Sequence, residues 1–333
     1  MKPVITIGIT SYNRINELER CIGSIKTRYD QDVEILVNED RSPLSEELRK
    51  KIEELAKTSK YHLRFTSNER NLGYDKNLGA IIEKAQGDFI FFLSDDDAMC
   101  GDFLDELILF LKQGTDAGVL YAPFVHSVSG LRDRVRGERN FPIAVGEKNA
   151  ARYIYDSILF SGLIFRKEYI EKYDAARFKN LNYYQVYLFL QMIKKYGGYY
   201  FSKPSVIFYG DGENAFGLSE SSKETPELAN RESAKTNLAF HKGLIKVIRM
   251  FDEDEGTRII DSFAKQYSLH SYTGLSSARR EGKKYFKEYW KMMNELDIKL
   301  HPITWIYYFS LLMFGEKMDR IMEPIRRKVK GNC

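Results

Sequence analysis

The sequence predicts an α/β fold built on a mostly parallel sheet with helices on both faces. Short runs of β-branched and aromatic residues alternate with segments whose apolar residues recur at helical spacing. This alternation is typical of βα units, in which crossover helices join parallel strands. Polar clusters follow four of the runs, and 333 residues, 43% of them hydrophobic, suffice to bury a large core.

Five β-rich runs mark the strands of the predicted sheet. The segments between them carry apolar residues three or four positions apart, such as Ile15, Leu18 and Ile22, and this spacing predicts helices. The predicted strands are, in order, Val4–Thr10, Val33–Val37, His62–Thr66, Asp88–Leu93 and Gly118–Val125.

Polar side chains follow each of the first four strands. The sequence TSYNR follows the first strand, NEDRSP the second, SNERNLGYDKN the third and SDDD the fourth. In sheets of this kind, ligands bind beyond the carboxyl ends of the strands. We therefore expect one binding site at this edge of the sheet.

From residue 126 onward the βα pattern loosens. Residues 126–149 have the composition of a long polar loop with Gly and Pro, and loops of this length are commonly functional. The elements predicted after this loop are a strand at Ser161–Phe165, a helix at Tyr183–Gly197 and an extended pair at Tyr199–Gly210.

The turn-rich segment Gly210–Glu227 marks a domain boundary. We expect a binding and catalytic domain over residues 1–225 and a helical region over residues 226–333. In that region, Ile303–Phe314 is an apolar run too short to span a bilayer. Such a segment lies at a membrane surface, packs on the core or contacts a second copy, and these readings stay open. The basic cluster that follows it comprises Arg326, Arg327, Lys328 and Lys330.

The composition excludes several classes of protein. The net charge of +4 is too small to indicate a nucleic-acid partner. The three cysteines, Cys21, Cys100 and Cys333, do not have the number or spacing of a disulfide framework or a zinc site. The sequence shows neither a signal peptide nor a run of about 18 apolar residues. We therefore expect a cytoplasmic protein, either free or peripheral at the inner face of the plasma membrane.

Asp95, Asp96 and Asp97 come almost directly after the apolar run Phe89–Leu93. Adjacent carboxylates repel one another, and a carboxylate removed from water needs a partner. Such hard oxygen ligands suit Mg²⁺ or Mn²⁺, which proteins bind through one or two carboxylates together with substrate phosphates. The alternative is a solvated N-cap for a helix that begins near Gly101.

Taken together, the strand-end motifs resemble those of family 2 glycosyltransferases, which have the GT-A fold. The resemblance rests on TSYNR, ILVNEDRS, NLGYDKNLG and GDFIFFLSDDD, in this order and at these intervals, and covers about the first 125 residues. It implies transfer of a sugar from a nucleotide diphosphate sugar, with UDP favoured, to a glycan hydroxyl. The implied acceptor is a bacterial surface polysaccharide, such as a capsule or O-antigen, assembled on undecaprenyl diphosphate.

The resemblance implies that Thr10, Tyr12 and Asp40 hold the nucleotide base. A carboxylate can accept a hydrogen bond from an imide N–H, and Tyr12 can offer a ring face. Two other readings stay open, because Tyr12 could be a packed aromatic residue and Asp40 could form an Asx-turn before Ser42 and Pro43.

The resemblance also assigns the remaining donor contacts. Asp95 would face the ribose, and Lys76 would contact a phosphate. Asp96 or Asp97 would bind Mn²⁺ or Mg²⁺, which bridges the diphosphate and neutralises the charge that grows on the leaving group.

At the catalytic base the sequence departs from the family. Inverting transfer needs a carboxylate to take the proton of the acceptor hydroxyl, and many relatives supply it from an acidic pair that opens a late helix. That place here holds Tyr184 and Gln185, and neither is a good base at neutral pH. Asp211 is our first substitute, with turn chemistry beside Gly210 as its alternative. The other candidates are Asp133, Glu138 and His126, of which His126 could equally be structural.

Two other functions stay open. The missing acidic pair is what a catalytically inactive nucleotide-binding or glycan-binding module would show. A sugar nucleotidyltransferase would need a Gly-rich basic loop after the first strand, and TSYNRINE contains none.

Overall fold

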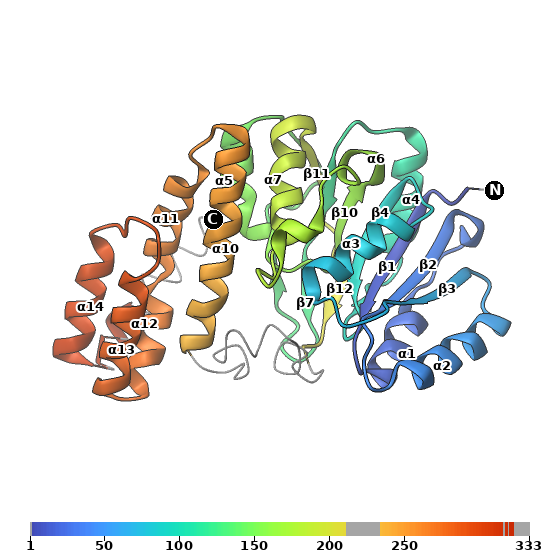
Figure 1. Cartoon of the computed structure of the whole chain (residues 1–333). Coiled ribbons are helices and arrows are strands. Elements are labelled where there is room, and N and C mark those ends of the chain that lie inside the picture. Colours follow the sequence, from blue (N-terminus) through green and yellow to red (C-terminus); the bar gives the residue numbers. More distant parts are fainter. Residues whose placement is uncertain (1, 211–233, 316, 319, 323–333) are drawn as a thin grey trace. The chain divides into compact units, whose positions relative to one another are not determined.

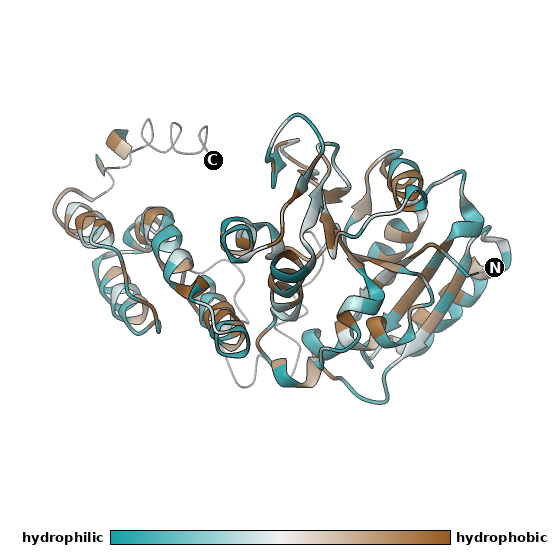
Figure 2. Cartoon of the chain, turned by 90° about the horizontal axis from the view of Figure 1, so that it is seen from above, coloured by the Kyte–Doolittle hydropathy of each residue, from teal (hydrophilic) through white to brown (hydrophobic). Residues whose placement is uncertain are grey.

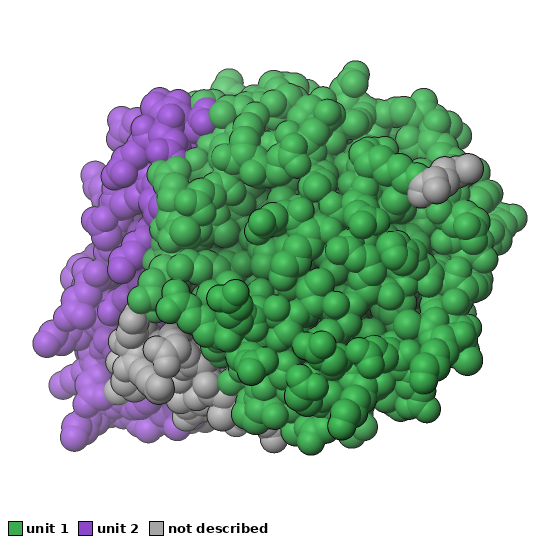
Figure 3. All heavy atoms as spheres, turned by 45° about the vertical axis from the view of Figure 1, so that its right-hand side comes forward, with its two compact units in different colours: residues 1–220 green, residues 221–333 purple. Residues whose placement is uncertain are grey.

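The structure is a computed structural model and describes residues 2–210, 234–315, 317–318 and 320–322. The chain divides into two compact units, residues 1–220 and residues 221–333, which are coloured separately in Figure 3. The predicted base Asp211 and the predicted basic cluster at residues 326–330 lie outside the described residues.

The first unit is built on an eight-stranded sheet with the strand order β3-β2-β1-β4-β10-β6-β11-β9 (Figure 1). β1 pairs in parallel with β2 and β4, and β2 pairs in parallel with β3, which confirms the predicted sheet. β10 runs antiparallel to β4 and β6. The strands are β1 (Ile5–Ser11), β2 (Val33–Glu39), β3 (His62–Ser67), β4 (Phe89–Ser94), β6 (Val119–Tyr121), β9 (Phe141–Ile143), β10 (Leu163–Arg166) and β11 (Gly198–Tyr200).

A second, four-stranded sheet begins where β4 ends. Its strands are short and have the order β5-β12-β7-β8. The chain passes from β4 into β5 through the three residues Asp95, Asp96 and Asp97, so the acidic triplet lies at the junction of the two sheets. The strands are β5 (Ala98–Met99), β7 (Phe124–His126), β8 (Arg132–Asp133) and β12 (Val206–Phe208).

Helices cover both faces of the large sheet. On one face, α1, α2 and α4 contribute Leu18, Leu48 and Leu107 to a core that includes Ile7 of β1. On the other face, α3 approaches β1 so closely that a Cβ at position 8 would overlap Ile81, which explains Gly8. Figure 2 shows hydrophobic residues along the strands between these layers. The longer helices are α1 (Ile15–Ser24), α2 (Ser45–Thr58), α3 (Tyr74–Lys84), α4 (Phe103–Gln113), α5 (Glu147–Tyr153) and α7 (Tyr184–Tyr196), and α6 (Lys167–Ile170) is a single turn.

Two sequence predictions are wrong in detail. The run Gly118–Val125 forms two strands, β6 and β7, which belong to different sheets and are separated by Ala122 and Pro123. Pro123 has no N–H for strand pairing. The predicted loop at residues 126–149 contains β8, β9 and the start of α5, and β9 forms an edge of the large sheet.

The described part of the second unit is helical. Phe251, Phe263, Leu275 and Phe286 are fully buried in its interior. Among the described residues, no helix is both long enough and apolar enough to cross a membrane. The helices are α10 (Ala234–Glu255), α11 (Ile259–His270), α12 (Tyr272–Arg280), α13 (Lys283–Asn294) and α14 (Ile303–Phe314).

Candidate functional site

The carboxyl ends of β1, β2 and β4 lie at one level. In the strand register, Thr10 of β1 lies opposite both Asn38 of β2 and Ser94 of β4. Because the register aligns these ends, the polar residues that follow each strand start side by side. The structure therefore brings three of the predicted motifs together.

The acidic triplet is buried. Asp95, Asp96 and Asp97 are 2%, 6% and 1% exposed, so the reading of a solvated helix cap is wrong. The Asp95 carboxylate accepts hydrogen bonds from the Tyr12 N–H at 3.2 Å and from Arg14 Nη1 at 2.8 Å. The same Arg14 nitrogen lies 3.2 Å from Asp96 Oδ2, so one guanidinium is shared by two carboxylates.

Asp97 is held by neutral groups. Ser161 Oγ donates to Asp97 Oδ2 at 2.6 Å, and the Tyr209 N–H donates to Oδ1 at 3.2 Å. Burial and the adjacent Asp96 charge raise the pKa of Asp97 to about 7. Burial also raises the pKa of Asp95 to about 6, although the Arg14 charge opposes that shift. A further cation at this cluster would relieve the repulsion among the three carboxylates.

Arg20 and Tyr209 complete the cluster, and the motifs did not indicate either residue. Arg20 Nη2 donates to the Asp96 carbonyl at 2.7 Å, and its guanidinium lies 3.9 Å from the centre of the Tyr209 ring. Arg20 comes from α1, whereas Tyr209 follows β12. The two residues therefore connect the first helix of the unit to its last described strand.

The donor atoms at Asp96 and Asp97 fit a divalent cation. Among the described residues, no group of three or more His, Cys, Asp or Glu side chains is arranged to hold a metal ion by itself. Mg²⁺ and Mn²⁺ do not require such a group when substrate phosphates and water supply the remaining oxygens. The two adjacent carboxylates thus suit the metal as a partial set of ligands.

Asp40 fixes the loop between β3 and α3. Its Oδ1 accepts hydrogen bonds from Asn68 Nδ2 and the Leu72 N–H, and its Oδ2 accepts one from the Gly73 N–H, all at 2.8 Å. These partners replace the Asx-turn that we considered. Burial raises the pKa of Asp40 to about 6. Its contact with a nucleotide base stays a prediction.

The other two predicted donor-binding side chains are less constrained. Tyr12 and Lys76 are half-buried. The Tyr12 ring stacks on no described aromatic residue, and the Lys76 ammonium forms no hydrogen bond or ion pair with a described residue. Within the described part of the chain, no side-chain contact thus occupies the Tyr12 ring or the Lys76 ammonium.

Tyr184 and Gln185 are unsuited to act as bases. The Tyr184 hydroxyl donates to the Tyr173 carbonyl, and burial raises its pKa. The Gln185 amide donates to the Ile158 carbonyl at 2.9 Å.

The described substitutes for the base lie on the surface. Asp133 and Glu138 are exposed, and neither touches the acidic triplet. Asp133 Oδ2 lies 3.9 Å from His126 Nε2, and the His126 ring contacts Phe124 and Phe208. His126 thus has the contacts of a structural residue.

Asp75 is a buried carboxylate that sequence reasoning missed. It belongs to α3 and is 1% exposed, yet it accepts hydrogen bonds from three N–H groups at the start of α7. The donors are Leu181 at 3.1 Å, Asn182 at 2.8 Å and Tyr184 at 2.9 Å. A helix cap normally stands next to its helix in the sequence, so a cap 109 residues away gives no local signal.

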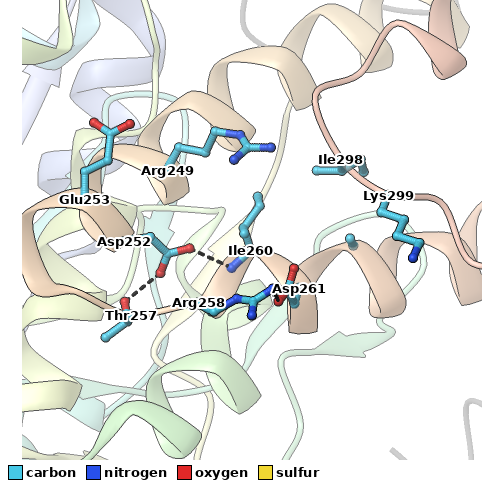
Figure 4. A pocket seen from close by; sticks show the side chains of 10 residues that line it. Arg249, Asp252, Glu253, Thr257, Arg258, Ile260, Asp261, Ile298 and Lys299 are labelled. Atoms are coloured by element: carbon cyan, nitrogen blue, oxygen red, sulfur yellow. Dashed lines mark hydrogen bonds and ion pairs between the residues drawn. The ribbon is translucent and has the colours of Figure 1, made fainter.

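A separate pocket of about 380 Å³ lies among helices of the second unit (Figure 4). Asp252 accepts hydrogen bonds from Thr257 and from the Ile260 N–H at the start of α11, and Arg258 pairs with Asp261. Neutral donors thus satisfy Asp252, and Asp261 pairs with Arg258, so the pocket lies at a polar junction between helices.

The chain resembles known proteins in sequence. Residues 6–174 match the family described as Glycosyl transferase family 2. The abequosyltransferase RfbV of Salmonella typhimurium is 26% identical over 230 residues, which are 63% of this chain and 68% of that protein. The GalNAc(5)-diNAcBac-PP-undecaprenol beta-1,3-glucosyltransferase of Campylobacter jejuni is 28% identical over 112 residues, or 34% of this chain and 36% of that protein.

Solved structures share the fold at low sequence identity. S. aureus TarS in complex with UDP-GlcNAc matches with a TM-score of 0.51 and 15% identity, covering 87% of this chain and 84% of that one. The mannosyltransferase PcManGT from Pyrobaculum calidifontis, in complex with GDP-Man and Mn²⁺, matches with a TM-score of 0.52 and 13% identity, covering 95% and 87%.

The family match spans half of the chain and includes β1 to β4 with the whole acidic triplet. The fold likeness identifies the α/β unit as a GT-A fold. The chain therefore belongs to glycosyl transferase family 2.

Proposed function

We propose that the chain transfers a sugar from a UDP-sugar to a hydroxyl of a glycan acceptor, with inversion at the anomeric carbon. The observation that carries this proposal is the buried triplet Asp95–Asp97 beside Thr10 and Tyr12, within the segment that matches the family. The UDP-GlcNAc bound in the TarS structure supports a UDP-sugar as the donor.

Different side chains contact different parts of the nucleotide sugar. Thr10, Tyr12 and Asp40 hold the base, and Asp95, oriented by Arg14, faces the ribose. Asp96 and Asp97 would hold a divalent cation, which would neutralise the charge that develops on the diphosphate leaving group. Lys76 contributes a second positive charge toward a phosphate.

We assign the catalytic base to Asp211. Inversion in one displacement requires a carboxylate on the acceptor side to accept the hydroxyl proton. Asp211 stands two positions after Tyr209, whose N–H donates to Asp97. Asp133 and Glu138, both exposed, are the alternatives.

For the acceptor we propose a lipid-linked glycan of bacterial polysaccharide synthesis, such as a capsule or O-antigen. The name of the Campylobacter jejuni relative specifies an undecaprenol-linked substrate, and that relative supports this class of acceptor. A lipid-linked acceptor would place the enzyme at the inner face of the plasma membrane.

The first test is calorimetric titration of UDP, GDP, CDP and dTDP with and without Mn²⁺, on wild type and Asp96→Ala. We expect tight binding of UDP that depends on Mn²⁺ and is at least tenfold weaker in the variant. Absence of nucleotide binding under every condition would overturn the site assignment.

Turnover is tested next with hydrolysis of UDP-sugars and with transfer to glycan acceptors. Asp211→Asn should lower the rate at least 100-fold and leave UDP affinity unchanged. Asp133→Asn tests the alternative base and should keep full activity. Nucleotide binding without any turnover would favour the inactive binding module.

A further inference from the structure

Helix α14 exposes an unusual amount of apolar surface. The run Ile303–Phe314 contains no charged residue, and among its side chains only Thr304 and Leu311 are buried. A helix that is apolar on all sides is normally buried on all sides. Surface of this kind marks a contact with a partner. The exposed fractions are 44% for Trp305, 62% for Ile306, 51% for Phe309, 75% for Met313 and 56% for Phe314.

Helix α13 presents lysines beside this face. Lys283, Lys287 and Lys291 recur every four residues, so they form one stripe along the helix, and Lys284 flanks it. All four are exposed, and none forms an ion pair with a described residue. A stripe of unpaired cations is available to an anionic partner.

Aromatic contacts join the two helices. Trp290 of α13 stacks on Tyr308 of α14 at 4.2 Å and meets Trp305 edge-on at 4.7 Å. Trp290 follows Lys287 by three residues and Lys283 by seven, so it lies on the lysine side of α13. The lysine stripe therefore borders the apolar face of α14.

The positive charge of the sequence is concentrated toward its C-terminus. Residues 283–333 contain 11 Lys and Arg against six Asp and Glu, a net charge of +5, whereas the whole chain has +4. The remainder of the chain therefore has a slight negative charge.

We propose that the exposed face of α14 and the lysines of α13 form a surface that docks on anionic lipid membranes. At 1.5 Å per residue, the 12 residues of α14 extend about 18 Å, which is too short to cross a hydrocarbon core of about 30 Å. The helix therefore lies in the plane of the interface with its aromatic residues at headgroup depth.

The positive charge of this surface favours a membrane over a second copy of the chain as its partner. In a two-fold symmetric dimer the same patch meets itself, so the second copy would bring more lysines to the contact and no anionic partner for the stripe. Anionic headgroups instead attract the stripe while the apolar residues insert. The inference uses only the second unit and does not depend on the proposed transfer reaction.

The test uses the two tryptophans of the chain, Trp290 and Trp305, which both belong to this surface. The full chain is mixed with vesicles of phosphatidylcholine alone or with equal phosphatidylglycerol, some carrying brominated acyl chains. We expect co-sedimentation and quenching by brominated lipid with the anionic vesicles. Binding to phosphatidylcholine, or to anionic vesicles in 0.5 M NaCl, should be at least tenfold weaker.

Two variants separate the contributions to binding. Ile306→Ser with Met313→Ser removes apolar contact, and Lys283→Gln with Lys287→Gln and Lys291→Gln removes charge. Each should weaken binding at least tenfold. The matched control Val128→Ser with Leu131→Ser alters exposed apolar residues of the first unit, 97% and 67% exposed, and should bind like wild type. Unchanged unfolding midpoints show that the variants fold.

Three results would overturn the proposal. They are an absence of vesicle binding, equal binding to neutral and anionic vesicles, and equal loss of binding in the control. Analytical ultracentrifugation adds a fourth. A dimer that Ile306→Ser with Met313→Ser disrupts, together with no vesicle binding, would assign the face to a second copy.

Discussion

At the scale of single residues, the three carboxylates of the acidic triplet have different partners. Asp95 and Asp96 share the guanidinium of Arg14, whereas the partners of Asp97 among the described residues are the neutral donors of Ser161 and Tyr209. Removing the cation from a buried ion pair leaves uncompensated charge, which is costly in an interior of low dielectric. Arg14 therefore stabilises the folded first unit as well as orienting the carboxylates of the site.

Arg14→Met should destabilise the first unit by about 3 kcal/mol, because two buried carboxylates lose their shared cation. Urea unfolding monitored by circular dichroism in EDTA measures the loss. Saturating Mn²⁺ should recover part of it, since a cation at Asp96 and Asp97 would replace the missing charge. The control Arg49→Met, at an exposed pair on α2, should change stability by less than about 0.5 kcal/mol. Equal stability of Arg14→Met and wild type in EDTA would contradict this role.

The sequence predicted the carboxylates of the site better than their partners. The triplet and Asp40 follow the carboxyl ends of strands, where ligands bind in sheets of this kind. Ser161 and Tyr209 lie 64 and 112 residues from Asp97, and nothing in their own neighbourhoods indicates the contact. Arg14 belongs to the TSYNR motif, but the motif does not indicate that Arg14 pairs with Asp95. That contact depends on the pairing of β1 with β4.

At the scale of elements, apolar runs located the long strands to within one or two residues. β1, β2 and β4 were predicted because buried parallel strands are rich in apolar residues. β3 is a half-buried edge strand and was predicted from its β-rich composition. Short strands were not predicted. For example, β8 has two residues and both are exposed, so no hydrophobic pattern indicates it. The break between β6 and β7 was not predicted, because the sequence does not show that these two strands belong to different sheets.

Asp75 couples α3 to α7, and its burial predicts how stability depends on pH. The pKa of Asp75 is raised to about 7 by burial, against backbone hydrogen bonds that lower it. A carboxyl whose pKa is higher in the folded state stabilises that state at low pH. This stabilisation is lost as pH rises through about 7.

From pH 8 to pH 5.5, Asp75 should therefore add about 2 kcal/mol to the free energy of unfolding. The measurement compares wild type with Asp75→Asn at both pH values, because other buried carboxyls titrate equally in both proteins. The difference between the two proteins should shift in favour of wild type at pH 5.5. A difference that is independent of pH would show that Asp75 keeps its ordinary pKa.

At the scale of the whole molecule, the chain has two compact units, and both tryptophans belong to the second. The residues proposed to bind nucleotide all belong to the first. A ligand stabilises only the state that binds it, by about 2.7 kcal/mol at 100 times its Kd. The two units should thus respond differently to one ligand.

We expect UDP with Mn²⁺ to raise the urea midpoint measured by tyrosine emission excited near 275 nm. The midpoint measured by tryptophan emission should stay within error. Asp96→Ala serves as the control, because it should lose the shift. A parallel shift of both signals would mean that the units unfold together.

The long-range partners of the acidic triplet also have a consequence for synthesis. At about 5–20 residues per second, a ribosome needs roughly ten seconds to proceed from Asp97 to Tyr209. During this interval the nascent chain already carries the four strand-end motifs, while Asp97 lacks Tyr209 throughout and lacks Ser161 until 64 further residues have been added. A shortened chain that ends before residue 161 would therefore keep the four strand-end motifs without either partner of Asp97.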